Sequence, residues 1–535
     1  GPAIIEERES TTVVPPGDTL TIDEAGNLRI AIAVASKGMD LVTPEMTKAE
    51  AVEKINSDPI SLEIMWSRLV TVSEEMWHTV CRTAYSLIIS ESQDFGCSIL
   101  DASGETLAHS SRVMPVFNLT LPMVVKAALA RYPADTLEPG DVLVCNDPWL
   151  CAGHLFDIAV ITPVFKHGKV VAVMGTVGHV GDIGGTRNGM KATELYEEGL
   201  QIPPMKLVKA GVENEDLFRI MAENIRDSQQ VLGDVRSLIA ANETGGKRLA
   251  AFLDEYGLSD LTALAEVVQS RSEKAMREAI RTLPDGVYHS TTTYNPLGTP
   301  MTVPVKVTIA GDEIELDFEG APAEVPLGGI NCTLSYTTAH STYPLKCMLT
   351  PNVRGNAGCY RAFTVKAPKG SVLNCNKPAP VSLRTRTGWY TSPNIFRALS
   401  EAAPEKVVAH TGLPSLMTVY GKTADGKVFY DHLLSGGDQG GSAVQDGKSS
   451  VLWPTSAATS SIELLESRSP VVVLEKSFVT DSGGVGEHRG GLGARIRLTK
   501  RHEDGLPLTV FVSPEGVNAP IDGLFGGQTG LLAHG

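Results

Sequence analysis

Two apolar, β-rich runs on either side of a short polar turn form the clearest pattern in this chain. Residues 158–165 are the first run, residues 166–169 are a polar turn that contains Gly168, and residues 170–177 are the second run. Runs of this length and composition, with a glycine between them, predict a β-hairpin.

The ends of this predicted hairpin carry residues suited to metal binding. A hairpin folds about its turn, so a turn centred near residue 167 places Asp157 opposite Gly178 and His179 opposite Phe156. His154 lies just upstream, in the loop that leads into the first strand. Two histidines and one carboxylate can hold Zn, Mn or Fe and leave coordination positions open. The alternative interpretation is that these are ordinary polar residues of a turn and two strand ends.

The remaining pattern alternates blocks of helix with blocks of strand. Asp58 and Pro59 suit the cap and first turn of a helix that reaches about residue 90. Further helices are expected at 121–132, at 217–270 with a break at Gly245 and Gly246, and at 272–282, 334–349 and 392–402. Strands are expected at 94–101 and 143–145, and again from residue 286 onward. Because helices and strands arrive in blocks, the predicted class is α+β, with helical blocks between several antiparallel sheets.

The same pattern divides the chain into four regions. Residues 1–30 form a short β-unit that is too small to fold well alone, and residues 31–57 are a connector with a helical piece near 46–55. Residues 58–285 hold the hairpin and most of the helices, and residues 286–535 are β-rich. Residues 181–207 lack periodicity, and we interpret them as an ordered loop over a site.

Composition narrows the function classes. The 535-residue chain has a net charge of −16 and no run of Lys and Arg, so we expect no nucleic-acid surface. No segment approaches about 18 apolar residues in succession, which predicts no membrane span. The first residues resemble neither a signal peptide nor a transit peptide. The eight cysteines include no C-x-x-C pair, so we expect reduced thiols and a cytoplasmic protein.

Two glycine-rich segments suggest phosphate binding. Residues 441–449 resemble a phosphate loop but are one residue too long for it, and a hairpin turn fits them better. Residues 481–493 suit either an anion cradle or a tightly packed loop at a domain contact.

Several separated motifs resemble those of the hydantoinase B/oxoprolinase family. They are N-D-P at 146–148, G-H-L-x-D at 153–157, E-G-L-Q-I-P-P at 198–204, N-A-G at 356–358, D-S-G-G at 481–484 and R-G-G-L-G at 489–493. They occur in the family's order, and the resemblance extends from about residue 58 to the C-terminus. Residues 1–30 resemble instead the end of hydantoinase A, which suggests a piece of a fused A–B polypeptide. The chain also looks shorter than the family at its C-terminal end.

The resemblance implies an ATP-dependent enzyme acting on an amide or a ketone, as in 5-oxoprolinase, N-methylhydantoinase, caprolactamase and the acetone and acetophenone carboxylases. It implies a hydantoinase A-like ATPase, as a subunit or fused domain of a hetero-oligomer, that binds ATP and Mg and phosphorylates the substrate. It also implies one divalent ion, Zn or Mn, on His154, Asp157 and His179. The family's frequent P-V-H-L-G motif reads P-V-F-N-L at 115–119, so Phe117 replaces a histidine and the substrate stays open.

Three functions are open on the sequence. In the first, a phosphorylated lactam or cyclic imide is hydrolysed, with Asp147, Asp182 and Glu198 as candidate catalytic groups and Arg187 as a substrate contact. In the second, the same ion supports carboxylation of a ketone. In the third, the chain is a non-catalytic scaffold. Each of these four side chains, taken alone, also fits a purely structural role.

Overall fold

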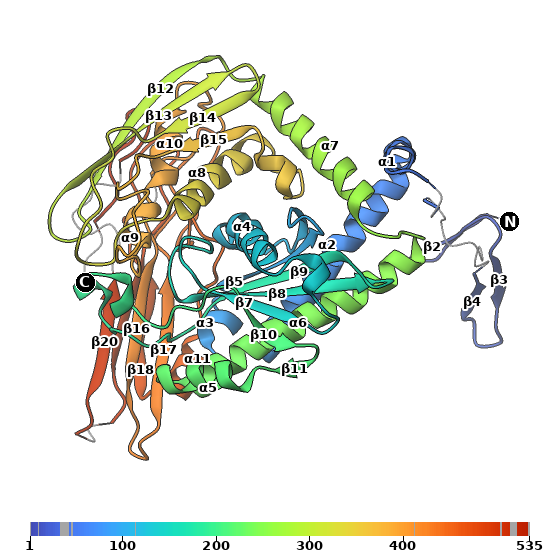
Figure 1. Cartoon of the computed structure of the whole chain (residues 1–535). Helices are drawn as coiled ribbons and strands as arrows, with labels where there is room; N and C mark the ends of the chain where they lie inside the picture. Colours follow the sequence, from blue (N-terminus) through green and yellow to red (C-terminus); the bar gives the residue numbers. More distant parts are fainter. Residues whose placement is uncertain are drawn as a thin grey trace.

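A seven-stranded sheet forms the centre of the molecule (Figure 1). The computed structural model describes residues 2–8, 10–32, 42–43, 46–112, 114–410, 412–502, 505–513 and 522–532. The strand order is β11 (Val212–Glu213), β10 (Met205–Lys209), β7 (Val142–Cys145), β8 (Asp157–Lys166), β9 (Lys169–His179), β5 (Phe95–Asp101) and β6 (Thr106–His109). Every pair in it is antiparallel. The predicted hairpin is β8 and β9, in the interior of this sheet.

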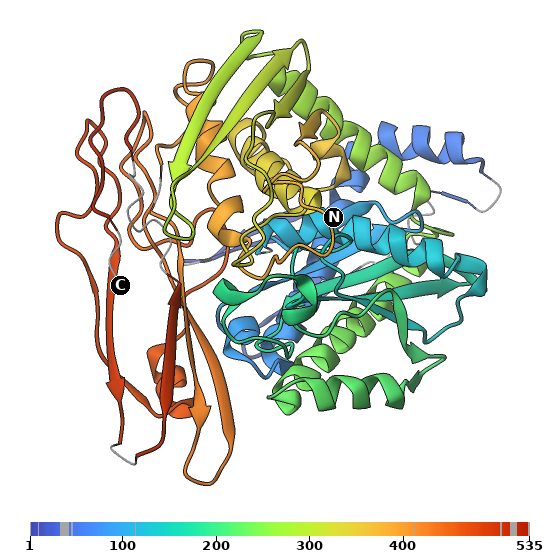
Figure 2. The same ribbon diagram turned by 60° about the vertical axis from the view of Figure 1, so that its left-hand side comes forward.

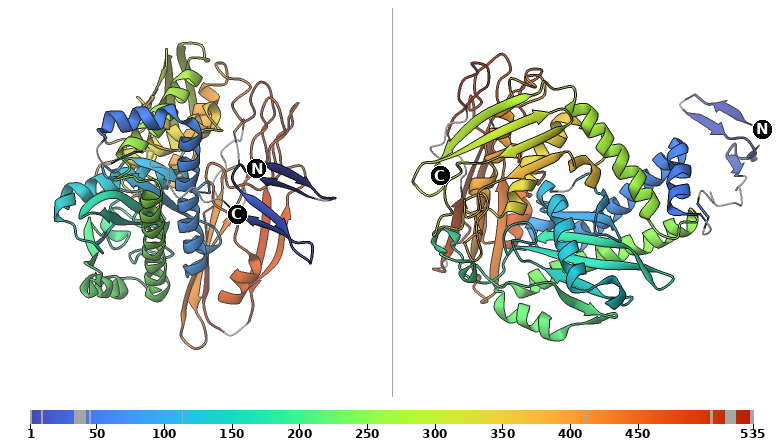
Figure 3. Two further views of the ribbon diagram at one scale, coloured as in Figure 1. Left: turned by 90° about the vertical axis from the view of Figure 1, so that its right-hand side faces the viewer. Right: turned by 45° about the horizontal axis from the view of Figure 1, so that its top comes forward.

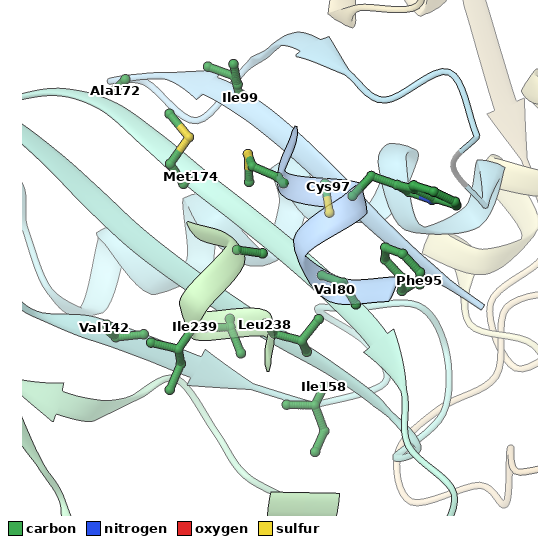
Figure 4. Close-up of a cluster of buried hydrophobic side chains, with 14 of the residues drawn as sticks. Val80, Phe95, Cys97, Ile99, Val142, Ile158, Ala172, Met174, Leu238 and Ile239 are labelled. Atoms are coloured by element: carbon green, nitrogen blue, oxygen red, sulfur yellow. The ribbon is translucent and has the colours of Figure 1, made fainter. Parts of the chain in front are cut away.

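Helices cover both faces of the central sheet because both faces are apolar. Ile158 packs in the core under α2 (Pro59–Thr83) and α6 (Ser228–Glu255), whereas the next residue, Ala159, belongs to the core on the other face. That other face is covered by α4 (Pro115–Arg131), on which α8 (Leu334–Leu349) packs. Figure 4 shows part of the first core, with Val80 of α2, Leu238 of α6 and Phe95 of β5. Burial on both sides explains why these strands read as continuous apolar runs.

The second half of the chain adds further sheets. β12 (Gly286–Tyr294), β13 (Met301–Ala310), β14 (Glu313–Asp317) and β15 (Phe363–Lys366) form one sheet, in which only the β14–β15 pair is parallel. β17 (Val428–Ser435), β16 (Ser415–Lys422) and β20 (Leu508–Ser513) form another, and β18 (Val471–Phe478) pairs with β19 (Ala494–Lys500). Figure 2 shows these last strands as a layer beside the body of the molecule. The arrangement confirms the predicted α+β class with several antiparallel sheets.

The N-terminal residues form two small hairpins, as expected. β1 (Ala3–Glu6) pairs with β2 (Thr11–Val14), and β3 (Thr19–Ile22) pairs with β4 (Leu28–Ala31). The helical piece of the connector is α1 (Lys48–Ser57), and much of the rest of residues 31–57 lies outside the described residues. The hairpins stand beyond α1, away from the central sheet (Figures 1 and 3).

The predicted helix break at Gly245 and Gly246 is wrong. α6 runs through both glycines without interruption. A Cβ atom on Gly245 would lie 2.5 Å from the sulfur of Met76 in α2, so this glycine allows two buried helices to approach closely. The chain breaks instead between α5 (Glu215–Asn224) and α6, where Asp227 caps α6, and again between α6 and α7 (Thr262–Ile280). No break occurs at residue 271, which separated two predicted helices but lies within α7.

The helix expected to reach residue 90 divides into two. α2 ends at Thr83, and α3 (Leu87–Ser90) begins after its cap, Ser86. The backbone amides of Tyr85 and Ser86 donate hydrogen bonds to Asp234 of α6, at 2.7 and 3.0 Å, which turns the chain at this point.

Shorter elements complete the fold. They are η1 (Ala134–Thr136), η2 (Gly189–Lys191), η3 (Leu195–Glu197), η4 (Ala357–Tyr360), α9 (Thr385–Gly388), α10 (Thr391–Ala398) and α11 (Ile462–Arg468). The predicted loop 181–207 therefore contains two 3-10 turns and ends in β10. Among the described residues, no helix is both long and apolar enough to cross a membrane.

Candidate metal centre

A β-bulge brings two of the predicted ligands face to face. Asp157 pairs directly with His179, not with Gly178 as a regular hairpin predicts. The pairing shifts by one residue near the turn, where Val171 is left without a partner on β8. In the regular register the side chains of Asp157 and His179 would lie on opposite faces of the sheet, because side chains alternate along a strand. The bulge therefore places both on one face.

The three side chains converge at the end of this hairpin. Nε2 of His154 lies 2.9 Å from Oδ1 of Asp157, and Nδ1 of His179 lies 3.4 Å from the same oxygen. One ligand atom from each residue fits within 4.8 Å of the others. His154 is 3% exposed and Asp157 is fully buried. Neither Nε2 of His154 nor Oδ1 of Asp157 has a partner with hydrogen-bond geometry among the described residues, so the donor set fits a cation.

The protonation states of His154 and Asp157 suit a metal ion. Burial and the charge of Arg384 lower the pKa of His154 to about 4, so its imidazole is neutral. Burial opposes ionisation of Asp157, but its contacts with His154 and the charge of Arg384 outweigh it and hold the pKa of Asp157 well below its usual range. Neutral imidazole and ionised carboxylate are the forms that bind metals.

Two further titratable side chains border the triad. Oδ2 of Asp94, just before β5, lies 3.8 Å from Nδ1 of His179, and burial raises the pKa of Asp94 to about 6. His432 of β17 faces His179, with ring centroids 6.1 Å apart. Both nitrogens of His432 are already engaged, Nδ1 with the hydroxyl of Thr418 and Nε2 with the carbonyl of Gly181, so His432 is not a free ligand.

A cavity of about 130 Å³ adjoins His154 and His179. Most of its walls are apolar or aromatic and include Met114, Val116, Phe117, Phe156, Leu383, Trp389, Leu416, Leu434 and Phe511. Its polar lining includes Tyr336 and His340, which lie one turn apart on α8. The hydroxyl of Tyr336 and Nδ1 of His340 are buried without a hydrogen-bond partner among the described residues. Such a cavity suits a small, mainly apolar molecule with a polar end.

Of the four other predicted site residues, only Arg187 lines this cavity. Its guanidinium carbon lies 4.8 Å from the ring centroid of Tyr420. Asp147 accepts hydrogen bonds from Gln201 at 2.7 Å and from Lys377 at 3.0 Å, outside the cavity.

Asp182 and Glu198 are also engaged outside the cavity. Asp182 is paired with Arg226 at 2.6 Å. Glu198 accepts hydrogen bonds from the backbone amides of Val381 and Ser382, at 3.0 and 2.9 Å. Burial raises the pKa of Glu198 to about 7. The catalytic roles assigned to Asp147, Asp182 and Glu198 stay predictions, and these contacts are of a structural kind.

Sequence reasoning missed several residues at the centre. Asp94 is the first residue of a predicted strand, a position that could have drawn attention. Arg384, whose Nη2 lies 2.7 Å from Oδ2 of Asp157, stands more than two hundred residues from its partner, and no local pattern marks it. Tyr336 and His340 lie on a correctly predicted helix, but nothing in the sequence shows that they face the hairpin.

The fold and the centre together describe a candidate metalloprotein of the α+β class, with a two-histidine, one-carboxylate site beside an apolar cavity. The model of the hydantoinase B/oxoprolinase family matches residues 58–534. The chain therefore belongs to this family, as the motifs indicated.

Similar proteins agree with this assignment. The caprolactamase subunit beta of Pseudomonas jessenii is 30% identical over 498 residues, which cover 89% of this chain and 83% of that protein. The crystal structure of the ATP-dependent caprolactamase from Pseudomonas jessenii superposes with a TM-score of 0.74 at 27% identity, covering 86% of this chain and 89% of the other. A nucleotide-free acetone carboxylase has a TM-score of 0.79 at 20% identity, covering 88% and 66%, which is a likeness of fold alone.

A longer relative covers the N-terminal hairpins as well. 5-Oxoprolinase 1 of Arabidopsis thaliana is 30% identical over 563 residues, which cover 99% of this chain but 42% of that protein. The chain thus spans less than half the length of this relative.

Proposed function

We propose that this chain is the B-type half of an ATP-dependent enzyme that opens a cyclic amide, with one divalent ion, Zn or Mn, on His154, Asp157 and His179. The observation that carries the proposal is the convergence of these three side chains at a mainly apolar cavity in a member of the hydantoinase B family. Caprolactam and 5-oxoproline, after which two relatives are named, are both cyclic amides.

The residues around the triad have different roles in the proposed reaction. A bound ion would polarise a substrate carbonyl or acidify a water molecule. Oδ1 of Asp94 is buried without a hydrogen-bond partner among the described residues, and it can accept a proton from a water molecule in the cavity. The apolar walls, including Phe117 and Phe156, keep bulk water away from the reacting group.

The polar lining of the cavity suits a substrate with an uncharged amide group and, once activated, an anionic phosphoryl group. Burial raises the pKa of Tyr336 above its ordinary value and lowers the pKa of His340 to about 3, so both side chains are neutral hydrogen-bonding groups. Arg187 forms no ion pair among the described residues and is exposed at the cavity. We assign Tyr336 and His340 to the amide of the substrate and Arg187 to the phosphoryl group of its activated form.

The ATP and Mg site is assigned to a hydantoinase A-like partner, as a subunit or a fused domain, in a hetero-oligomer. The alignment of almost the whole chain, N-terminal hairpins included, with a longer 5-oxoprolinase supports a fused arrangement. Ile4, Val13 and Ile22 in these hairpins are 65–69% exposed, which leaves apolar surface for such a partner to cover. Because ATP is the co-substrate and the eight cysteines are free thiols, we place the enzyme in the cytoplasm.

An activity assay with the A-type ATPase present tests this proposal. The chain, joined to or mixed with that ATPase, should release ADP when a lactam or cyclic imide is added and should form the ring-opened acid. A ketone with labelled bicarbonate is the parallel assay. Incorporation of label into the product would show that the enzyme is a carboxylase and would overturn the proposed amide hydrolysis. Activity that is independent of metal, and unchanged in His179→Ala, would leave this chain the role of a scaffold.

A further inference from the structure

Residues 381–384, which follow β15 and directly precede α9, reach across to the hairpin and contact two of the three proposed ligands. The carbonyl oxygen of Ser382 lies 3.3 Å from Nδ1 of His154. The guanidinium of Arg384 donates from Nη2 to Oδ2 of Asp157 at 2.7 Å. We propose that this segment, the ligand clamp, confines Asp157 to one ligating oxygen and so keeps a coordination position open for substrate; the inference rests on the metal site proposed above.

The clamp leaves His154 and Asp157 one atom each for the ion. An Nδ1–H of His154 that donates to Ser382 leaves Nε2 unprotonated, and Nε2 is the atom that faces Asp157. Oδ2 of Asp157 is occupied by Arg384, whereas Oδ1 has no partner with hydrogen-bond geometry among the described residues. A free carboxylate can chelate a metal ion through both oxygens, but this carboxylate has one to offer.

Arg384 is itself held in a fixed orientation. Its Nε donates to the carbonyl of Ala152 at 2.7 Å. Two N–H groups of one planar guanidinium therefore bind Ala152 and Asp157, on either side of His154. The ring of Tyr336 covers its other side, with the guanidinium carbon 4.4 Å from the ring centroid. Gly153 makes room for this stack, since a Cβ atom there would lie 2.9 Å from both Arg384 and Tyr336. With only 4% of its surface exposed, Arg384 has little freedom to swing away.

Glu198 anchors the clamp from behind. Its carboxylate accepts hydrogen bonds from the amides of Val381 and Ser382, and it is 1% exposed. The amide of Leu383 donates to the carbonyl of Gly329 at 2.8 Å, which ties the middle of the segment to the second half of the chain. Glu198 is thus a positioning residue that acts through the clamp, and this explains why it lies outside the cavity.

The absorption spectrum of the Co²⁺-loaded protein tests the clamp, because bands of higher-coordinate Co²⁺ are weaker than those of four-coordinate Co²⁺. Arg384→Met frees Oδ2 of Asp157, so its Co²⁺ bands should weaken severalfold and its affinity for added azide, which needs an open position, should fall at least tenfold. Arg384→Lys, which keeps a charged donor near Oδ2, should restore most of the wild-type spectrum. Arg226→Met removes a comparable ion pair with Asp182, away from the triad, and should leave spectrum and azide binding unchanged.

The outcomes separate this inference from the metal site itself. A wild-type chain that binds neither Co²⁺ nor Zn²⁺ would overturn the proposed site. A wild-type chain that binds Co²⁺, together with an Arg384→Met spectrum and azide affinity equal to wild type, would overturn the clamp alone. If Arg384→Met fails to fold, Glu198→Gln decides, because loosening the anchor should shift the spectrum in the same direction by a smaller amount, and an unshifted spectrum would overturn the clamp.

Discussion

The end of the β8–β9 hairpin and the glycine-rich loops at 441–449 and 481–493 both stand out in the sequence, but for different physical reasons. At the hairpin end, folding buries polar atoms such as Nε2 of His154 and Oδ1 of Asp157, for which the described residues offer no partner with hydrogen-bond geometry. In the glycine-rich loops, by contrast, several backbone amides pair with carbonyls: Gly447 donates to Arg489 at 2.8 Å, and Gly491 donates to Gln439 at 2.9 Å.

The glycines of these loops serve close packing of backbone on backbone. A Cβ atom on Gly447 would lie 1.8 Å from the carbonyl oxygen of Gln439, and one on Gly491 would lie 2.1 Å from that of Lys448. These paired amides cannot cradle a phosphate, so around Gly447 and Gly491 the contacts favour a tightly packed loop. The comparison teaches that unpaired buried polar atoms, rather than unusual composition, mark the candidate site in this molecule.

Removing a candidate ligand at the hairpin end should produce the largest effect, a loss of metal binding. His154→Ala and His179→Ala should each lower the affinity for Zn²⁺ or Mn²⁺ by more than the 10–100-fold that is typical of losing an outer partner of a ligand. Metal analysis of the purified proteins, with His432→Ala as the matched control, measures this. Equal metal content in wild type and both ligand variants would reject the site.

Replacing the clamp anchor should change how stability depends on pH. Burial raises the pKa of Glu198 from 4.5 to about 7 in the folded chain, so the folded state binds this proton more tightly than the unfolded state. The contribution of Glu198 to stability is therefore largest below pH 4.5 and falls as the pH rises toward 7. Glu198→Gln cannot ionise and should lack this fall, a difference on the order of 3 kcal/mol between the two profiles. Urea unfolding at several pH values measures it, and parallel profiles would contradict the prediction.

Adding a methyl group to a glycine-rich loop should cost stability but not metal. Gly447→Ala forces backbone atoms apart, and we expect a loss of about 1–3 kcal/mol in the free energy of unfolding. The affinity for Zn²⁺ should stay at the wild-type value, because the loop does not touch the triad. Loss of metal together with stability would show that the two regions are coupled.

The hairpin turn offers the smallest change and sharpens the comparison within the first region. Gly168 has φ of +75° and open space around it, so Gly168→Ala meets no neighbour and costs only the left-handed backbone penalty, about 1 kcal/mol. Metal affinity should be unchanged, since the bulge and the sheet fix the register of the ligand end. A drop in metal affinity would mean that the turn, and not the bulge, positions His179.

The amino-acid sequence was sufficient to predict those features that depend on neighbouring residues. The helix at 334–349 has the predicted bounds, and the hairpin forms where its apolar runs lie, with Asp157 and His179 at its end as expected. The false break at Gly245 shows the limit of local reasoning. Glycine weakens an isolated helix, but a partner helix that needs the space outweighs that cost.

Tertiary structure decided the rest. The register of Asp157 and His179 depends on a bulge at Val171, which no turn rule predicts, and a one-residue slip would have separated the two side chains. Arg384 meets Asp157 only because the second half of the chain packs on the central sheet. The candidate ligands were thus encoded locally, within and just before a hairpin. The environment that sets their charge and orientation comes from distant segments, whose approach is fixed by burial of the shared core.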